Sequence, residues 1–187
     1  MEEDIKKCIE ILRKGGLILY PTDTIWGIGC DATNAEAVKR VYDLKRRADS
    51  KAMLVLLDSE NRLERYVDDV PEIAYQLIEV AIEPLTIIYD GARNIAPNLM
   101  GDNRSIGIRI TREDFSKQLC QRFGRPIVST SANISGQPSA PTFADLSDEI
   151  KRGVDYVVTF RQDDTTAVKP SSIIKLSSDG TFKILRK

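Results

Sequence analysis

Short apolar runs alternate with helix-like patterns along most of this 187-residue chain. Short runs rich in Leu, Ile and Val predict buried strands. These runs occupy residues 17–20, 53–57, 85–89, 105–110, 127–130, 156–160, 172–176 and 181–185. Helical spacing of apolar residues predicts helices at about 5–14, 33–47, from 71 onward, around 115–123 and at 145–150. The alternation favours an α/β fold, in which a twisted open mixed sheet is flanked by helices.

Local signals at the ends of these segments support their boundaries. Thr33 and Glu36 have capping-box spacing at a helix start, and Gly124 follows the last apolar residue of another helix. The Ser177-Ser-Asp-Gly180 sequence predicts a turn that joins the last two strands as a hairpin. Neither an internal repeat nor a long linker divides the chain, so we predict one domain over residues 1–187.

The composition removes several classes of enzyme. The chain has no histidine, which excludes serine–histidine and cysteine–histidine nucleophile pairs and HExxH zinc proteases. Its three cysteines are scattered, as in a reduced cytosolic protein, and have neither disulfide nor metal-ligand spacing. An acidic N-terminus and the lack of a long apolar run predict a cytoplasmic protein without a membrane segment.

A polar loop, Tyr20-Pro-Thr-Asp-Thr-Ile-Trp-Gly-Ile-Gly29, follows the first predicted strand, where open α/β sheets place ligand loops. Thr24 and its neighbours offer hydroxyl and carboxylate groups, and Trp26 offers an apolar wall. A simple turn that ends the strand explains the same residues about as well. Gly27-x-Gly29-x-x-Ala32 also matches a dinucleotide fingerprint, but weakly, because six residues separate the strand from the first glycine.

Two further segments suggest an anionic ligand. Lys45-Arg-Arg47 with Lys51 forms a basic cluster, although cations at a helix C-terminus also simply complement the helix dipole. Ser129-Thr-Ser-Ala-Asn-Ile-Ser-Gly136 is a loop of small hydroxyl residues that can approach a phosphate closely, or an ordinary surface loop. The chain has no Walker sequence, so a nucleotide would have to bind in another way.

Together these segments resemble the ordered motifs of the L-threonylcarbamoyladenylate synthase (YrdC-like) family. The motifs span nearly the whole chain, and their order is more specific than any one of them. They are Pro21-Thr-Asp-Thr-x-Trp-Gly, Lys45-x-Arg47, Ser105-x-x-x-Arg109, Ser129-x-Ser-Ala-Asn-x-Ser-Gly136, Pro170-Ser-Ser172 and Leu185-Arg186. The resemblance implies a sheet with a concave, positively charged face, on which Lys45, Arg47, Lys51, Arg109 and Arg186 should converge.

The resemblance also implies roles for individual residues. The positions expected to bind ATP are Arg47, Lys51, Ser105, Ser131, Asn133, Ser139 and Arg186, with Asn133 as either a nucleotide contact or a structural residue of its loop. The positions expected to bind L-threonine are Thr24, Arg109, Ser129 and Ser172. Lys45 and Arg47 are expected to be catalytic, through neutralisation of the phosphate charge.

The chain departs from the family pattern at two places. Ala81-Ile-Glu-Pro-Leu-Thr86 keeps only the proline and threonine of the usual Trp-Pro-Gly-Pro-x-Thr. Leu56 stands where some longer members have a histidine at the threonine site, so that contact is expected to be absent.

The activity that the resemblance implies is a nucleotidyl transfer. L-threonine, bicarbonate or CO2, and ATP give L-threonylcarbamoyladenylate and pyrophosphate, and partner proteins use the product to modify tRNA beside the anticodon. We expect Mg2+ to arrive with ATP, because no carboxylate cluster suggests a metal site of the protein itself. The alternative is a non-catalytic module that binds structured RNA such as tRNA through its basic residues. Against it stand a net charge of -1 and the lack of RRM and KH signatures.

Overall fold

The computed structural model describes residues 1–47, 53–166, 168–177 and 180–187. Its helices are α1 (Glu2–Arg13), α2 (Ala35–Lys45), α3 (Glu72–Val80), α4 (Asp114–Phe123) and α5 (Asp148–Gly153). Its strands are β1 (Ile18–Tyr20), β2 (Gly27–Gly29), β3 (Leu54–Leu57), β4 (Leu85–Tyr89), β5 (Ile106–Ile110), β6 (Ile127–Ser131), β7 (Tyr156–Val157), β8 (Ser172–Leu176) and β9 (Phe182–Arg186). No helix in these ranges is both long enough and apolar enough to cross a membrane.

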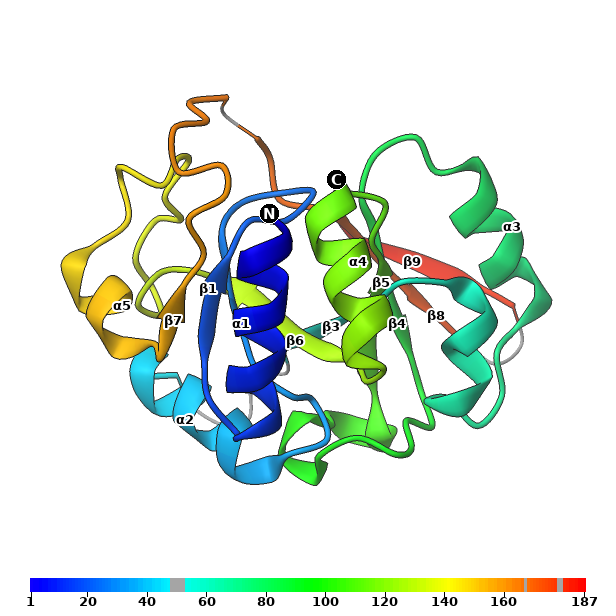
Figure 1. The fold of residues 1–187 in the computed structure, drawn as a ribbon. Coiled ribbons are helices and arrows are strands. Elements are labelled where there is room, and N and C mark those ends of the chain that lie inside the picture. The colour runs from blue at the N-terminus through cyan, green and yellow to red at the C-terminus, as the bar shows by residue number, and fades with distance from the viewer. Residues whose placement is uncertain (48–52, 167, 178–179) are drawn as a thin grey trace.

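The described strands form one nine-stranded mixed sheet, in the order β7-β1-β2-β6-β3-β5-β4-β8-β9. Parallel and antiparallel neighbours both occur, as in the pairs β3–β5 and β4–β5. Helices α1 and α4 pack side by side over one face of the sheet (Figure 1). The open mixed sheet flanked by helices is therefore confirmed.

Most predicted segments are confirmed, with corrections at their ends. Asn34, not Thr33, caps α2, because its side chain accepts hydrogen bonds from the Glu36 and Ala37 amides. The predicted strand at 156–160 is only the two residues of β7. Gly124 ends α4 with a φ of 77°, as predicted. The hairpin of β8 and β9 is present, but Ser178 and Asp179 of its predicted turn lie outside the described residues.

Strand β2 is the one described strand of the sheet that the sequence patterns did not indicate. It contains only Gly-Ile-Gly, which lacks the alternation and branched residues that mark strands. Its register explains the glycines, because a Cβ on Gly29 would lie 2.7 Å from the Tyr20 ring. The glycines of the dinucleotide match therefore belong to a strand between β1 and β6, which overturns that reading of the motif.

Register places the side chains of neighbouring strands on common faces, and this decides where the site lies. Val55, Ile108 and Ile87 stand opposite one another in β3, β5 and β4 and are buried on one face. Leu56, Arg109 and Thr86 form the adjacent row, whose side chains point to the other face. The latter face carries the polar groups of the central strands.

The carboxylate of Asp4 joins the first helix to the far end of the chain. Its oxygens accept hydrogen bonds from Tyr156 Oη at 2.8 Å, Thr159 N at 2.9 Å and Phe160 N at 3.3 Å. Burial raises the pKa of Asp4, but the hydrogen bonds from Thr159 and Tyr156 outweigh that effect and lower it below 3.8. Asp4 therefore stabilises the fold at neutral pH, and this contribution is lost as pH falls through the lowered pKa.

We predict that Asp4→Ala lowers the free energy of unfolding at pH 7 by about 2–3 kcal/mol, because donors of Tyr156, Thr159 and Phe160 lose an ionised acceptor. Urea unfolding at pH 7 measures the loss, with the exposed Asp69→Ala as control. Equal stability of the two variants would contradict this role for Asp4.

Candidate functional site

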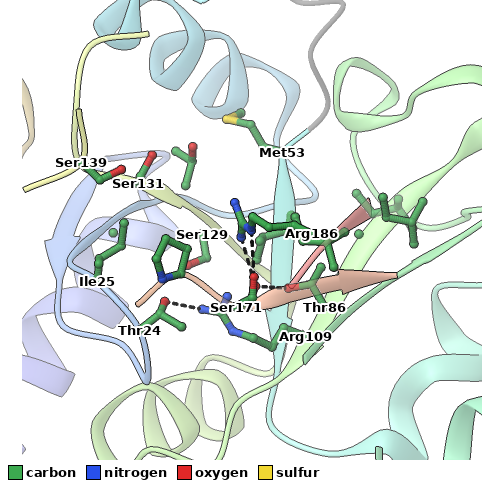
Figure 2. Close-up of a pocket in the computed structure, with 18 of the residues that line it drawn as sticks. Thr24, Ile25, Met53, Thr86, Arg109, Ser129, Ser131, Ser139, Ser171 and Arg186 are labelled. Carbon is green, nitrogen blue, oxygen red and sulfur yellow. Dashed lines mark hydrogen bonds between the residues drawn. The ribbon is translucent and has the colours of Figure 1, made fainter. Parts of the chain in front are cut away.

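The polar face of the sheet carries a pocket of about 280 Å³ (Figure 2). It is lined by predicted site residues from six separate parts of the chain. These are Thr24, Arg47, Ser105, Arg109, Ser129, Ser131, Ser139 and Arg186. The volume is near the lower end of the range of about 300–1,000 Å³ for ligand pockets. The structure thus brings most of the predicted site together.

Strand glycines keep the floor of the pocket open. Gly107 lies on β5 between Leu54 of β3 and Ile88 of β4. A Cβ on Gly107 would meet Leu54 Cβ and Thr86 Cγ2 at 3.3 Å. Trp26 forms part of the wall, as predicted, and packs against Phe143 with ring centroids 4.8 Å apart.

Arg109 is the most deeply buried cation of the pocket, with 3% of its surface exposed. Strand β5 holds its backbone, and its Nη2 donates a hydrogen bond of 3.4 Å to Thr24 Oγ1. The same Nη2 lies 3.0 Å from Asp23 Oδ1. Its Nε is buried and has no hydrogen-bond partner. Because buried donors are almost always paired, this free Nε is a position for a ligand acceptor.

The loop that carries Thr24 is fixed by its own hydroxyl groups. Thr22 Oγ1 donates to the Ile25 carbonyl at 2.8 Å and accepts from the Thr24 amide at 3.0 Å. Arg161, from the loop after β7, adds a hydrogen bond to the Thr22 carbonyl at 3.4 Å. The predicted turn is therefore present, and residues 24–27 after it also line the pocket, so the two interpretations are compatible.

Asp23 supplies the carboxylate that the sequence predicted for the polar loop, but no ligand role was predicted for it. It stands behind Arg109, outside the lining of the pocket. Burial raises the pKa of Asp23 and the neighbouring Glu113 raises it further, whereas Arg109 lowers it. The net increase means that the ion pair with Arg109 only partly offsets the cost of burying this carboxylate.

Lys45 does not line the pocket but lies behind its serine-rich loop, with only 1% of its surface exposed. Its Nζ donates hydrogen bonds to the Ser131 carbonyl and, at 2.6 Å, to the Asn133 carbonyl. Its own carbonyl accepts from the Ser135 amide at 2.8 Å. Lys45 therefore fixes the shape of residues 131–135.

Asn133 is part of the same support. Its Nδ2 donates to the Gln137 carbonyl at 2.6 Å, and its Oδ1 lies 3.4 Å from Lys45 Nζ. Neither Asn133 nor Lys45 is among the residues that line the pocket, so the structure does not bring them to the ligand position assigned from the sequence. The physical reason is that these polar groups are already used within the protein.

The end of α2 separates Lys45 from Arg47. Arg46 adopts a left-handed conformation with φ of 50°, and the Arg47 amide then bonds the Tyr42 carbonyl at 3.0 Å. This turn sends Arg47 into the pocket, where burial lowers its pKa. Lys51, the fourth predicted cation of the cluster, lies outside the described residues.

Ser171 lies in the pocket where Ser172 was predicted. Ser171 Oγ is 2.8 Å from Thr86 Oγ1, and both side chains are buried. Ser172 is in register with Leu85, so its side chain points to the opposite face of the sheet. Thr86 and Ser171 are therefore further residues of the pocket lining, whereas the predicted Ser172 does not line the pocket.

Arg186 completes the pocket from the edge strand β9. Its Nε donates to the Ser171 carbonyl at 2.9 Å, and Nη2 lies 3.5 Å from Ser171 Oγ. Burial and the nearby charge of Arg109 both lower the pKa of Arg186. Of the five cations predicted to converge, Arg47, Arg109 and Arg186 do so.

The electrostatics of the pocket favour anions. Three arginines line it, and the described lining residues include neither Asp nor Glu. No group of three or more Cys, Asp or Glu that could hold a metal ion occurs in the described part of the chain. The residues of the lining thus fit ligands that bring their own negative charge.

Comparison with known proteins identifies the fold and the family. The Sua5/YciO/YrdC family model, described as "Telomere recombination", matches residues 10–187. The chain belongs to the Sua5/YciO/YrdC family. Threonylcarbamoyl-AMP synthase of Pseudoalteromonas translucida is 34% identical over 160 residues, which cover 84% of this chain and 86% of that protein. The enzyme of the same name from Hahella chejuensis is 33% identical over 153 residues, covering 81% and 83%.

Solved structures of the family share the whole fold. A variant of P. abyssi Sua5 has a TM-score of 0.88 and 25% identity, and covers 100% of this chain. This chain matches 56% of the length of that protein. P. abyssi Sua5 complexed with L-threonine gives a TM-score of 0.87 at 24% identity, covering 100% and 54%. E. coli YciO gives 0.85 at 24% identity, covering 100% and 90%.

The departures from the pattern of the Sua5/YciO/YrdC family have separate consequences. Leu56 stands directly beside Arg109 in the sheet and is fully buried, so it gives the guanidinium an apolar neighbour. Ala81, Ile82 and Glu83 line a second cavity of about 270 Å³ together with Asp23, not the arginine-lined pocket. The altered segment therefore lies on the far side of Asp23 from that pocket.

We predict that Lys45→Met changes the pH dependence of stability. Burial of the ammonium, with a smaller contribution from Arg47, lowers the pKa of Lys45 to about 8 from 10.5. Between these two values the unfolded chain binds more protons than the folded protein. The wild type should therefore gain stability relative to Lys45→Met as pH rises from 7.5 to 10, measured by urea unfolding.

The control for this experiment is Lys117→Met, which alters an exposed lysine on α4. Its difference from the wild type should remain constant over the same range. A constant difference for Lys45→Met as well would contradict the burial of a charged ammonium.

Proposed function

We propose that this chain is a threonylcarbamoyl-AMP synthase, a nucleotidyltransferase that joins L-threonine, bicarbonate or CO2, and ATP. The observation that carries the proposal is the pocket in which Arg47, Arg109 and Arg186 gather with hydroxyl donors and without a carboxylate. Curated relatives at 34% and 33% identity bear the same enzyme name and match most of this chain. The longer P. abyssi protein shares only the fold and part of its length.

The reaction needs no nucleophile from the protein. The amine of threonine attacks CO2, a C–N bond forms, and a proton leaves to give a carbamate; with bicarbonate the other product is water. A carbamate oxygen then attacks the α-phosphorus of ATP. The new P–O bond forms as the bond to the bridging oxygen breaks, and pyrophosphate leaves. Both partners are anions, so placed cations and donors lower the barrier.

The pocket offers a separate group of residues to each partner. Arg109, with Thr24 and Ser129 beside it, would bind the carboxylate of threonine through its free Nε. Arg47 and the hydroxyls of Ser131 and Ser139 would bind the phosphates. Ser105 and Arg186, also in the lining, are the further contacts we assign to ATP.

Magnesium would reach the site on the nucleotide. Phosphate oxygens are its ligands in this proposal, since the described lining has no carboxylate to hold it. When bound, Mg2+ would supply charge neutralisation for the leaving pyrophosphate. The arginines orient the phosphate chain, and Lys45 with Asn133 keeps the serine-rich loop in shape.

The product would pass in the cytoplasm to partner proteins that modify tRNA beside the anticodon. The alternative, a module that binds structured RNA, has less support, because Arg47 and Arg186, two of its proposed cations, line a pocket of about 280 Å³ instead of an open surface. Arg46, from the same basic cluster, is paired with Glu149.

The deciding experiment is pyrophosphate release by the purified wild-type protein. We predict release that requires ATP, L-threonine and bicarbonate together, and stops when any one is omitted. The same reactions analysed by mass spectrometry should contain threonylcarbamoyl-AMP. Salt-sensitive tRNA binding without any pyrophosphate release would overturn the enzyme and favour the RNA module.

We predict that Arg109→Lys raises the KM for L-threonine by about 10- to 100-fold, because lysine keeps the charge but loses the planar fork and its Nε donor. The KM for ATP should change much less. Arg122→Lys, at an exposed ion pair with Glu2, is the matched control. A KM for threonine equal to that of the control would remove Arg109 from the carboxylate site.

A further inference from the structure

One row of side chains crosses the polar face of the sheet between two arginines. Strand register places Thr86 of β4 next to Arg109 of β5, Ile173 of β8 next to Thr86, and Arg186 of β9 next to Ile173. Three strand spacings, about 14 Å, therefore separate the backbones of the two arginines. Figure 2 shows Arg186 pointing to Ser171 from one side, and Arg109 on the other side with its guanidinium directed toward Thr24.

The middle of the row contains two buried hydroxyls. Thr86 Oγ1 and Ser171 Oγ are 2.8 Å apart, and each residue is 1% exposed. One hydroxyl proton is used between them, and Arg186 Nη2 approaches Ser171 Oγ at 3.5 Å as a donor. The other hydroxyl proton remains available to a ligand oxygen. Both residues line the pocket, so such an oxygen can reach them.

Two positively charged side chains, Arg109 and Arg186, lie near these hydroxyls. Arg109 and Arg186 are close enough for the charge of Arg109 to lower the pKa of Arg186. Asp23 balances Arg109 from behind, outside the pocket, and the described lining supplies no carboxylate to either arginine. Two guanidinium groups around a hydroxyl donor form a site for a carboxylate-like anion.

The connectivity of the product indicates which anion this is. Threonylcarbamoyl-AMP carries a carbonyl group bonded on one side to the threonine nitrogen and on the other, through oxygen, to the α-phosphorus. That group must lie between the amino-acid end of the pocket at Arg109 and the nucleotide contacts. Thr86 stands beside Arg109 in the sheet. The carbonyl of Ser171 accepts a hydrogen bond from Arg186, the residue that we assign to ATP. The hydroxyl pair thus occupies the junction.

We propose that Thr86 and Ser171 form the subsite for the one-carbon unit, which they bind as the carbamate of the amino acid; this rests on the proposed function. The hydroxyl whose proton is free donates a hydrogen bond to one carbamate oxygen. The two arginines balance the negative charge of the carbamate. The other carbamate oxygen remains unprotonated to form the P–O bond, while the bond from phosphorus to the leaving pyrophosphate breaks. The hydroxyls exchange no proton with the substrate in this step.

The test compares two buried threonine–serine pairs in the same protein. Thr111 Oγ1 lies 2.7 Å from Ser116 Oγ, and both are fully buried, but Thr111 does not line the arginine-lined pocket. Thr86→Val and Thr111→Val therefore lose equivalent hydroxyls, one inside the site and one outside it. For the wild type and each variant, the KM for ATP, L-threonine and bicarbonate is measured by varying one substrate while the other two are saturating.

We expect Thr86→Val to raise the KM for bicarbonate by about 5- to 20-fold, and Thr111→Val to leave it unchanged. Thr86→Ser should restore most of the affinity. In CO2-free buffer, the increase in melting temperature that L-threonine causes should be the same in Thr86→Val and the wild type, because the carboxylate contact at Arg109 is retained.

Each other result has a definite meaning. An unchanged KM for bicarbonate in an active Thr86→Val protein overturns the subsite and leaves the proposed function intact. A main effect on the KM for ATP, or loss of the threonine-induced thermal shift, also overturns it, because Thr86 then belongs to another ligand. Wild-type protein without pyrophosphate release would instead mean that the proposed function itself fails.

Discussion

The buried guanidinium of Arg109 is the charge on which the rest of the pocket depends. A cation with only 3% of its surface exposed is costly unless it is paired, and Asp23 at 3.0 Å supplies one partner from behind. Leu56, beside Arg109 in the sheet, gives the guanidinium an apolar neighbour. Gly107, two residues before Arg109, has no side chain and so leaves space in the pocket. The hydrogen bonds of Thr22 order the loop of residues 21–26. This order holds Thr24 where it accepts a hydrogen bond from Arg109. The strand register thus places Arg109, and the loop supplies Thr24 and Asp23 as its partners.

The pocket as a whole carries more positive charge than its lining can balance. Arg47, Arg109 and Arg186 face one another across hydroxyls and small residues, and mutual repulsion of this kind persists only when the folded scaffold holds the groups in place. The proposed substrates, with their carboxylate, carbamate and phosphate groups, would complete the balance. This accounts for a chain without histidine: a transfer between two anions is limited by charge repulsion, and a bound amine and a phosphate need no imidazole.

Much of this arrangement could be predicted from the sequence because its signals are local. Helix α4 has both its apolar spacing and its glycine end within ten residues, and the resemblance of ordered motifs brought eight lining residues together in advance. The failures concern information that is not local. Strand β2 has no pattern of its own and exists because β1 and β6 pair with it. The choice between Ser171 and Ser172 depends on the register of β8 with β4, where a shift of one residue reverses the face.

Lys45 and Arg47 show why a motif alone does not identify the groups that touch a substrate. They are two residues apart and both are basic, yet the left-handed turn at Arg46 sends one side chain behind the serine-rich loop and the other into the pocket. The ammonium bonds two carbonyls of that loop, while the guanidinium faces the space in which phosphates would lie. A compact ammonium suits carbonyl oxygens that converge on one point, and a planar fork suits phosphate. If lysine and arginine were exchanged, the serine-rich loop would lose the compact ammonium that binds its carbonyls, and the pocket would lose its planar guanidinium. The turn at Arg46 therefore gives a physical reason for the order Lys-x-Arg.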